Sequence, residues 1–498
     1  MNVNPITRLD YPDPDVIRVE DTYYMVSTTM HFMPGCEILQ SFDLVHWEHV
    51  TYVYETLDHT DAQQLKSGQN IYGQGMWAAS LRYHEGRFCI CFVANDTRKT
   101  YLYTSEKIDG PWKKQLIEGF YHDGSLLFDE DGRNYIVYGN DEIWITELNE
   151  DLTAPKKDGL HRLLVSDHKN PELGYEGSHI QKINGYYYIF LIHSLRDRWM
   201  RTEACFYSDS LEGEFTGGDV LCDDRGYCGQ GVAQGGIVDT PDGKWYAMLF
   251  QDSGAVGRIP ILLPVIWKDH FPFFGQNGHV PEEIEVHSTR PGYIYQPLVG
   301  SDDFCNGLLP RWQFNHDPDP RYYHLDALQG TYTITTREVC TELTQAVNTL
   351  TQRMSYPSCA AEVTVDASAL KEGDVAGLCA LQSCYAAVGI TKHHGKYEVL
   401  MLDKKEDGIL DMTEGTVVES HQMDFRLEAD FCNMKDEARC YYRVNKGDWL
   451  PIGTVHKLYF KLDHFTGCRF GLFCYAAEET GGSACFRDFK YYDVDEIS

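Results

Sequence analysis

Short runs of alternating apolar and polar residues fill the first 275 or so positions, and five stretches among them align without a gap. Each stretch starts with one distinctive side chain, which we call the repeat head, and reaches a turn nine residues later. An aromatic-rich segment with the period-2 pattern of a β-strand follows every turn. The stretches are residues 13–22, 77–86, 123–132, 176–185 and 234–243, and the segments after them are YYMV, RFCICF, RNYIVY, YYYIF and KWYAML.

This repeat recurs every 46 to 64 residues. Such a period, with a strand, a turn and a second strand in each copy, is typical of a β-propeller with one blade per copy. Because there are five copies, the sequence predicts a five-bladed β-propeller, to which we assign residues 1–295.

The repeat stops near Pro291, Gly292 and Pro297, which suggest a linker. Beyond it the chain alternates again without the repeat, in TYTITT, AAEVTV, GKYEVLML, CYYRV, FGLFCYA and CFRDFKYYD. With no helical periodicity, residues 300–498 are predicted to form a β-sandwich of jelly-roll, concanavalin-like type. The whole chain is therefore expected to be all-β.

Composition narrows the possible partners. The net charge of −32 disfavours nucleic acid and anionic membrane, so a neutral ligand is expected. The 16 cysteines include no CxxC pair, and the opening residues contain no apolar segment of the secretory type. We therefore expect free thiols and a cytoplasmic protein, and leave open whether it forms a homo-oligomer.

The five heads are Asp13, Trp77, Asp123, Glu176 and Gln234. In a propeller the innermost strands surround one axis, so matched positions far apart in sequence meet at one mouth. A single Asp before a strand is usually a turn cap, but three carboxylates at matched positions cost stability unless they have a function. Glycoside hydrolysis needs such carboxylates, one as acid and one to activate water. Trp77 either stacks on a sugar ring or packs between blades.

The segments around these heads resemble a known family. NPITRLDYPDPDVIRVEDTYYMVSTTM with PGCEILQSFDLVHW, then YHDGSLLFDEDGRNYIVYG and YEGSHIQKINGYYYIF, resemble three ordered motifs of glycoside hydrolase family 43. DDF…RWQFNHDPDP resembles the C-terminal sandwich of its β-xylosidase and α-L-arabinofuranosidase branch. The resemblance covers nearly the whole chain.

The resemblance implies roles for individual residues. Asp13 matches the general base, Asp123 the residue that tunes the pKa of the acid and orients it, and Glu176 the general acid. Family members also have an arginine late in the propeller that holds sugar hydroxyls, for which Arg290 is the best match. The family is inverting, which implies about 6.5–9.5 Å between the base and acid carboxyl groups.

Two positions depart from the family pattern. Gln234 stands where many members have a histidine that reaches towards an axial calcium or water cluster, and its neutral amide weakens the expectation of an axial metal but is still expected to hydrogen-bond a water or a sugar. We expect that no cofactor is required and leave a calcium ion, axial or structural, open. Met30 stands where related xylosidases have a phenylalanine in the pocket wall, and His31 in the same loop could border the pocket. Asp302, Asp303 and Asp488 could hold a structural calcium but fit a solvated surface better, His316 is expected to be structural, and the turn EETGGSACF could rim the pocket.

The resulting hypothesis is an exo-acting, inverting glycosidase that releases terminal α-L-arabinofuranose, with β-D-xylose as a candidate second product, from arabinoxylan-type oligosaccharides. Three alternatives stay open: a mainly β-xylosidase activity, a non-catalytic sugar-binding protein, and a retaining five-bladed fructosidase, although the motifs of the last are not found at the expected places.

Overall fold

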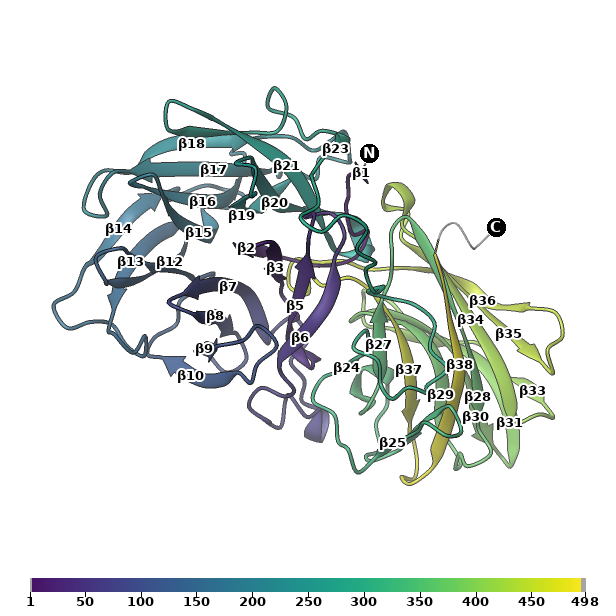
Figure 1. Ribbon diagram of the computed structural model, residues 1–498. Coiled ribbons are helices and arrows are strands. Elements are labelled where there is room, and N and C mark those ends of the chain that lie inside the picture. The colour runs from purple at the N-terminus through teal and green to yellow at the C-terminus, as the bar shows by residue number, and fades with distance from the viewer. Residues whose placement is uncertain (1, 494–498) are drawn as a thin grey trace.

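The computed structural model describes residues 2–493 and consists of two β-domains (Figure 1). The first contains five four-stranded antiparallel sheets arranged as the blades of a propeller. In each blade the strands follow one another in chain order from the innermost to the outermost, and blade one omits β4. Their strands are β2 (Asp15–Val19), β3 (Thr22–Val26), β5 (Gly35–Ser41) and β6 (Glu48–Tyr54) in blade one; β7 (Met76–His84), β8 (Arg87–Ala94), β9 (Lys99–Ser105) and β10 (Lys113–Ile117) in blade two; β11 (Ser125–Phe128), β12 (Asn134–Asn140), β13 (Glu142–Leu148) and β14 (His161–Ser166) in blade three; β15 (Glu176–Ile183), β16 (Tyr186–Ser194), β17 (Arg201–Ser208) and β18 (Thr216–Leu221) in blade four; and β19 (Ala233–Asp239), β20 (Trp245–Asp252), β21 (Arg258–Lys268) and β22 (Phe271–Phe274) in blade five.

The five sequence repeats form the two inner strands of the five blades, which confirms the predicted fold. Each repeat folds into an antiparallel hairpin, for example β7 with β8 and β15 with β16. Their turns hold Glu85–Gly86 and Asn184–Gly185, all four residues with positive φ, as the two-residue turns that match strand twist require. A short pairing of β1 (Asn2–Val3) with β23 (Glu283–Ile284) completes the first domain.

The second domain is a sandwich of two antiparallel sheets, in agreement with the predicted class. The segment GKYEVLML forms the second strand of an antiparallel hairpin, in which His393 lies opposite Lys396. One sheet contains β24 (Gln313–Asn315), β27 (Leu350–Arg353), β29 (Val375–Leu381), β30 (Tyr385–His393), β31 (Lys396–Lys404), β32 (Leu410–Met412), β33 (Thr416–Val418) and β37 (Arg469–Tyr475); the other contains β25 (Tyr323–Asp326), β26 (Thr331–Thr335), β28 (Ser358–Asp366), β34 (Gln422–Asp430), β35 (Glu437–Val444), β36 (Leu450–Lys457) and β38 (Ser483–Asp493).

One short strand joins the two domains. Strand β4 (Phe32–Met33), from the first blade's own sequence, pairs with β24 and so becomes the edge strand of a sandwich sheet. Behind it, Arg353 of the sandwich forms a buried ion pair with Glu37 of blade one at 2.8 Å and donates to the carbonyl of Asp10. Because these charges are paired and desolvated together, removing one partner would be costly, and the domains are held firmly against each other.

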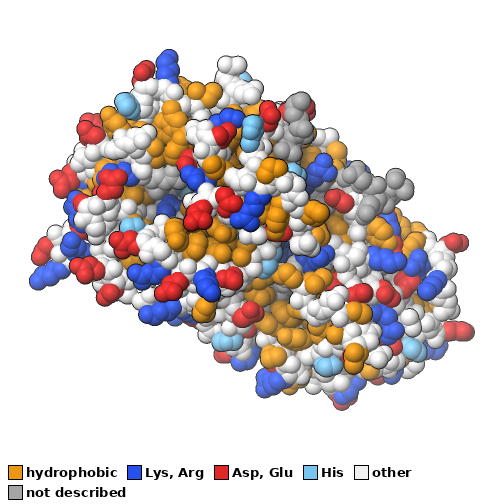
Figure 2. Space-filling model, viewed as in Figure 1, with side chains coloured by type: hydrophobic (Ala, Val, Ile, Leu, Met, Phe, Trp, Pro, Cys, Tyr) orange, Lys and Arg blue, Asp and Glu red, His pale blue; other side chains and the backbone are white. Residues whose placement is uncertain are grey.

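The helical content of the described residues is limited to four three-residue 3₁₀ turns, η1 (Lys66–Gly68), η2 (Gly254–Val256), η3 (Leu343–Gln345) and η4 (Cys432–Met434). Within residues 2–493 no helix has the length and apolar character to cross a bilayer. All 16 cysteines are free thiols. Acidic and basic side chains intermingle over the face in Figure 2, so the strongly negative net charge is dispersed on that face.

Candidate active site

The five repeat heads meet in one cavity at one mouth of the propeller. Its volume is about 180 Å³, smaller than the roughly 300–1,000 Å³ of most ligand pockets, which suits one sugar ring. The lining consists of the five heads Asp13, Trp77, Asp123, Glu176 and Gln234, together with His122, Leu173, Trp199, Arg201, Arg258, Leu462 and Phe465.

The backbone at the heads is strained in a way that turns these side chains into the cavity. Asp13, Asp123 and Gln234 have φ of 53°, 48° and 59°, in the left-handed region that non-glycine residues seldom adopt. In blade four the positive φ, 66°, falls on Gly177, directly after Glu176. The inner hairpins of blades two and four also shift register just after their heads, and that of blade five shifts across its head, as β-bulges do beside functional sites.

Asp13 is buried and held by two donors. Thr28 Oγ1 donates to its Oδ2 at 2.6 Å, and Arg258 Nη1 donates to its Oδ1 at 2.7 Å. The Arg258 guanidinium lies over the rings of Phe250 and Phe465, 4.6 and 4.0 Å from their centroids. These two bonds fix the orientation of the carboxylate, as a general base requires.

His122, Asp123 and Glu176 form a second group. His122 Nε2 lies 3.6 Å from Asp123 Oδ2 and 3.6 Å from Glu176 Oε2. Asp123 Oδ2 accepts a hydrogen bond from the backbone N–H of Gly177 at 3.1 Å, and Glu176 Oε2 accepts one from Asn140 Nδ2 at 2.6 Å. Asp123 therefore fixes the backbone beside Glu176.

The charges of this group are unequal. The negative charge of Asp123, with a smaller contribution from Glu176, outweighs burial and raises the pKa of His122 to about 9. Burial, together with the charges of Glu176 and Asp13, raises the pKa of Asp123 to about 6 against the opposing effect of His122. Burial also disfavours ionised Glu176, but the contact with His122 outweighs it and lowers the pKa of Glu176.

This order differs from what the resemblance implied. The carboxyl group with the raised pKa is Asp123, the expected tuning residue, and not Glu176, the expected acid. The physical reason is the balance around His122: its contact outweighs burial at Glu176, whereas at Asp123 burial and the charges of Glu176 and Asp13 outweigh it. The sequence reasoning did not single out His122. It directly precedes Asp123 in the YHDGS motif, and that adjacency was the available signal.

Arg290 does not line the cavity, contrary to the expectation. Its exposed guanidinium pairs with Asp21 at 2.8 Å and lies over the ring of Phe42, because the segment after the last blade runs along the outside of blade one. The cavity arginines are Arg258 and Arg201, the first residues of β21 and β17. An arginine begins the third strand in each of two successive blades, and this pattern could have identified both residues. It was missed because the aligned repeats cover only the first two strands of each blade.

Met30 and His31 are also outside the cavity lining. Their loop is drawn into the domain interface by β4: the backbone of Met30 pairs with Met76, and its Sδ accepts a hydrogen bond from Thr466 Oγ1 at 3.7 Å. His31 is buried with ring contacts to Phe32, Tyr72, His316 and His464. His316 is likewise buried, and its Nε2 accepts a hydrogen bond from the backbone of Ile71 at 3.0 Å, which is the structural role expected of it.

The sandwich domain supplies part of the rim. Leu462 and Phe465, from the loop before β37, line the cavity, and Phe465 meets Trp77 edge-on at 5.1 Å between ring centroids. The turn EETGGSACF, which was a candidate for this position, instead bonds to Thr336 within the sandwich. Trp77 is half-buried and faces the cavity rather than packing between blades.

The described residues contain one group of side chains close enough to share a metal ion, His122, Asp123 and Glu176, whose ligand atoms lie within 4.8 Å of one another. The pKa of His122 is raised to about 9, so its ring would have to release a proton before it could bind a metal ion. At the sandwich entrance, both oxygens of Asp302 are taken, by the indole N–H of Trp312 and the backbone N–H of Phe304 at 2.8 Å each, which does not suit a structural calcium.

A five-bladed propeller with carboxylates, arginines and aromatic rings gathered around one small cavity defines a glycoside hydrolase. The chain belongs to glycosyl hydrolase family 43, whose sequence profile matches residues 3–272. Residues 301–492 match the β-xylosidase C-terminal concanavalin A-like domain.

Three similar proteins illustrate the range of the relatives. A β-xylosidase of Formosa agariphila is 26% identical, over 99% of this chain and 89% of that protein. A non-reducing-end α-L-arabinofuranosidase of Bacteroides ovatus is 23% identical, over 82% and 79%. A solved structure of a bifunctional GH43-CE protein of Bacteroides eggerthii has a TM-score of 0.92 and 42% identity; the match covers this whole chain but only 64% of that one.

Proposed function

We propose that this protein is an exo-acting, inverting glycoside hydrolase that releases terminal α-L-arabinofuranose, and β-D-xylose as a second substrate, from short arabinoxylan-type oligosaccharides. The observation that carries the proposal is the single cavity of about 180 Å³ that Asp13, Asp123 and Glu176 share. Leu462 and Phe465 narrow its rim, which favours the end of a sugar chain over its middle.

Two features of the cavity support a carbohydrate ligand. Among the described residues, the indole N–H of Trp77 and Nε of Arg201 have no hydrogen-bond partner although both are buried. Unsatisfied buried donors are costly, and sugar hydroxyls are acceptors that would satisfy them. The faces of Trp77 and Phe465 offer apolar surface for the ring carbons.

In the mechanism we propose, Asp13 takes a proton from a water molecule as its oxygen attacks the anomeric carbon from one side of the ring. Glu176 gives a proton to the glycosidic oxygen as the bond to the anomeric carbon breaks on the other side. The products are a free sugar of inverted anomeric configuration and the shortened oligosaccharide, whose former glycosidic oxygen is now a hydroxyl group. Asp13 is left protonated and Glu176 ionised. Exchange with solvent restores both groups.

His122 provides the route by which Glu176 is kept supplied with a proton. Glu176 has a lowered pKa in the free site, and His122, with a pKa of about 9, is protonated at neutral pH. Its Nε2 lies 3.6 Å from Asp123 Oδ2 and 3.6 Å from Glu176 Oε2 and has no hydrogen-bond partner. In the mechanism we propose, His122 moves into hydrogen-bond distance of either carboxylate when substrate displaces water, and passes a proton between them. Asp123 would then orient the acid through Gly177 and hold a shared proton.

The decisive test measures hydrolysis of 4-nitrophenyl α-L-arabinofuranoside and 4-nitrophenyl β-D-xyloside by the same preparation. We expect turnover of both, faster on the arabinofuranoside. Faster turnover of the xyloside would establish the alternative of a mainly β-xylosidase activity, which the name of the Formosa agariphila relative favours. Inactivity on both would overturn the exo-pentosidase proposal.

The roles are tested with Glu176→Gln, compared with Glu85→Gln in the exposed turn of blade two. The first substitution should abolish turnover and leave sugar binding largely intact, and the second should change neither. Full activity of Glu176→Gln would refute the assignment of the acid. Proton NMR of the first-formed sugar should show inversion, whereas retention would favour a mechanism of the fructosidase kind.

The compartment is part of the proposal. We place the enzyme in a reducing cytoplasm, acting on imported oligosaccharides, because its 16 cysteines are free thiols and most of them are buried. Treatment of the purified protein with a thiol reductant should leave both its activity and its melting temperature unchanged. A loss of stability on reduction would contradict this placement.

A further inference from the structure

Arg82 extends across the propeller and contacts strands of several blades at once. It belongs to β7 of blade two, its side chain is largely buried, and all five of its N–H groups have acceptors. Nε donates to the carbonyl of Leu126 at 2.9 Å, Nη1 to Asp15 Oδ2 at 2.8 Å and the carbonyl of Leu81 at 2.6 Å, and Nη2 to Ser125 Oγ at 2.7 Å and the carbonyl of Ile180 at 3.3 Å.

These acceptors lie just behind the three carboxylates of the active site. Asp15 follows Asp13 by two residues, Ser125 follows Asp123 by two, and Ile180 follows Glu176 by four. Arg82 therefore ties together the three strands that begin at the proposed base, tuning residue and acid. A shift of one strand against another would break at least one of these bonds.

Among the groups that contact Arg82, the carboxylate of Asp15 carries the negative charge. It is fully buried, and its Oδ2 also accepts the backbone N–H of Leu81 at 2.7 Å, while its Oδ1 lies 3.1 Å from His179 Nδ1. Burial would raise the pKa of Asp15, but Arg82 and His179 outweigh it and lower the pKa. Arg82 and Asp15 thus form a charge-neutral pair at the centre of the propeller.

The surroundings of Arg82 and Asp15 do not fit a calcium ion. The ion takes roughly six to eight oxygen ligands, with carboxylates prominent among them. Both oxygens of Asp15 are already engaged with N–H groups or the His179 ring, and the guanidinium of Arg82 would repel a divalent cation beside it. Gln234, at the head where many family members have a histidine, lines the catalytic cavity and offers only a neutral amide.

We propose that Arg82 is a built-in axial cation: it takes the place of a metal ion at the propeller axis and positions the strands that carry Asp13, Asp123 and Glu176. The catalytic part of this inference rests on the proposed hydrolase function. The structural part, that the fold needs no calcium because Arg82 supplies the charge, does not.

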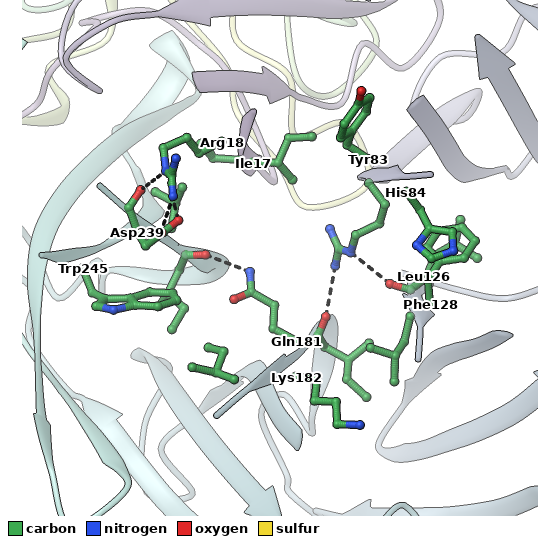
Figure 3. A pocket seen from close by; sticks show the side chains of 17 residues that line it. Ile17, Arg18, Tyr83, His84, Leu126, Phe128, Gln181, Lys182, Asp239 and Trp245 are labelled. Atoms are coloured by element: carbon green, nitrogen blue, oxygen red, sulfur yellow. Dashed lines mark hydrogen bonds and ion pairs between the residues drawn. The ribbon is translucent and has the colours of Figure 1, made fainter. Parts of the chain in front are cut away.

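A second cavity makes the proposal open to chemical rescue. It has a volume of about 410 Å³, is lined by the later parts of the five inner strands, and includes Arg82 among its lining residues. Figure 3 shows its surroundings, with Arg18 paired to Asp239 between blades one and five, and Gln181 donating to the fifth blade. A small cation can therefore approach the position of the Arg82 side chain from solvent without crossing the catalytic cavity.

The first experiment treats the wild-type protein with EDTA and then with millimolar calcium, following the melting temperature and the rate on the preferred nitrophenyl glycoside. We expect neither quantity to change. A fall in melting temperature with EDTA that calcium reverses would overturn the proposal. The melting temperature needs no substrate, so this result stands even if the protein hydrolyses neither glycoside and the proposed function fails.

The second experiment compares Arg82→Ala, Arg82→Lys and the control Arg133→Ala, whose exposed guanidinium pairs with Asp131 in a turn of blade three. Misplaced carboxylates should lower kcat of Arg82→Ala by about 100-fold while KM changes by less than about threefold, because binding groups stay in place. Arg82→Lys keeps the charge but loses the fork of donors, and should be intermediate. Arg133→Ala should match the wild type.

Guanidinium at low millimolar concentration should restore part of kcat and of the melting temperature of Arg82→Ala, whereas urea at the same concentration should restore neither. Wild-type kcat in Arg82→Ala, or equal effects of guanidinium and urea, would overturn the positioning role. If Arg82→Ala does not fold, Arg82→Lys provides the same kcat-against-KM comparison. If no glycoside is hydrolysed, recovery of the melting temperature by guanidinium still tests the axial cation.

Discussion

The guanidinium of Arg258 donates a 2.7 Å hydrogen bond to the carboxylate of Asp13, and this contact joins the last blade of the propeller to the first. Arg258 opens β21, whereas Asp13 lies 245 positions earlier, before β2. The backbone N–H of Arg258 also donates to Asp10 at 2.8 Å. Closure of the ring and orientation of the proposed base therefore depend on the same residue.

Replacing Arg258 by Met should lower kcat by about 100-fold, because Asp13 would lose the cation that orients it. The measurement is steady-state hydrolysis of the better nitrophenyl glycoside. The matched control is Arg290→Met, whose guanidinium pairs with Asp21 on the surface and whose loss should change kcat by less than about twofold. An equal loss in both variants would contradict the assignment of Arg258 to the site.

The pH dependence should report His122. Unfolded histidine titrates near 6.5, and the pKa of His122 in the fold is about 9. Stability from its positive charge is thus fully present below about pH 6.5 and is lost as the pH rises through about 9. We expect kcat/KM to fall with an apparent pKa of about 9, because Glu176 then loses its proton supply.

The control for this profile is a second histidine. His122→Gln should lower kcat/KM and remove the alkaline limb, while His84→Gln, in a half-exposed ring stacked on Phe128 at the other mouth, should leave the limb in place. The profile is measured in buffers from about pH 5 to about pH 10. An alkaline limb that survives in His122→Gln would show that another group titrates there.

The acid side of the stability profile should report Asp123. Its pKa is raised from the unfolded value of 3.8 to about 6, so the neutral carboxyl group is favoured in the fold. The stability linked to this proton is fully present below about pH 3.8 and is lost as the pH rises through about 6. Asp123→Asn cannot ionise, so the difference in melting temperature between it and the wild type should change between these pH values. A difference independent of pH would contradict the raised pKa.

The sequence predicted the propeller and the candidate site at its mouth because both depend on local, repeated features. A hairpin with a turn at a fixed distance leaves a period in the sequence, and the heads of the repeat share one backbone position. The repeat alone was therefore enough to place Asp13, Asp123 and Glu176 together.

The remaining site residues depend on contacts that leave no such period. Arg201 and Arg258 come from third strands, and Phe465 comes from a loop in the other domain. Met30 and His31 were misplaced because β4 leaves its own blade to pair with β24, a long-range event that local patterns do not encode. Arg290 was misplaced because the chain after the last blade returns along the outside of blade one.

Gly177 should tolerate no side chain, and this is a stringent test of the geometry beside Glu176. Its φ is +66°, and an added Cβ would lie 2.7 Å from Cγ of Gln234. Gly177→Ala should therefore destabilise the protein by about 1–3 kcal/mol and lower kcat, because the clash displaces the residue next to the proposed acid. The control is Gly185→Ala, with φ of +85° and nothing within 4 Å of its added Cβ. It carries the strain without the clash, so a kcat as low as that of Gly177→Ala would contradict the explanation.

Phe465 should determine how the sandwich domain contributes to substrate binding. Its ring centroid lies 5.1 Å from that of Trp77 and 4.0 Å from the guanidinium carbon of Arg258. It therefore forms an apolar wall of the cavity and makes no hydrogen bond to the three carboxylates. Phe465→Ala should raise KM by about tenfold and leave kcat within about threefold, because it removes an apolar wall rather than a reacting group. The matched control is Phe273→Ala, which replaces a half-exposed ring in β22, the outermost strand of blade five, and should leave KM unchanged. If kcat of Phe465→Ala fell while KM stayed constant, the ring would act by orienting Arg258 and not as a wall of the sugar pocket.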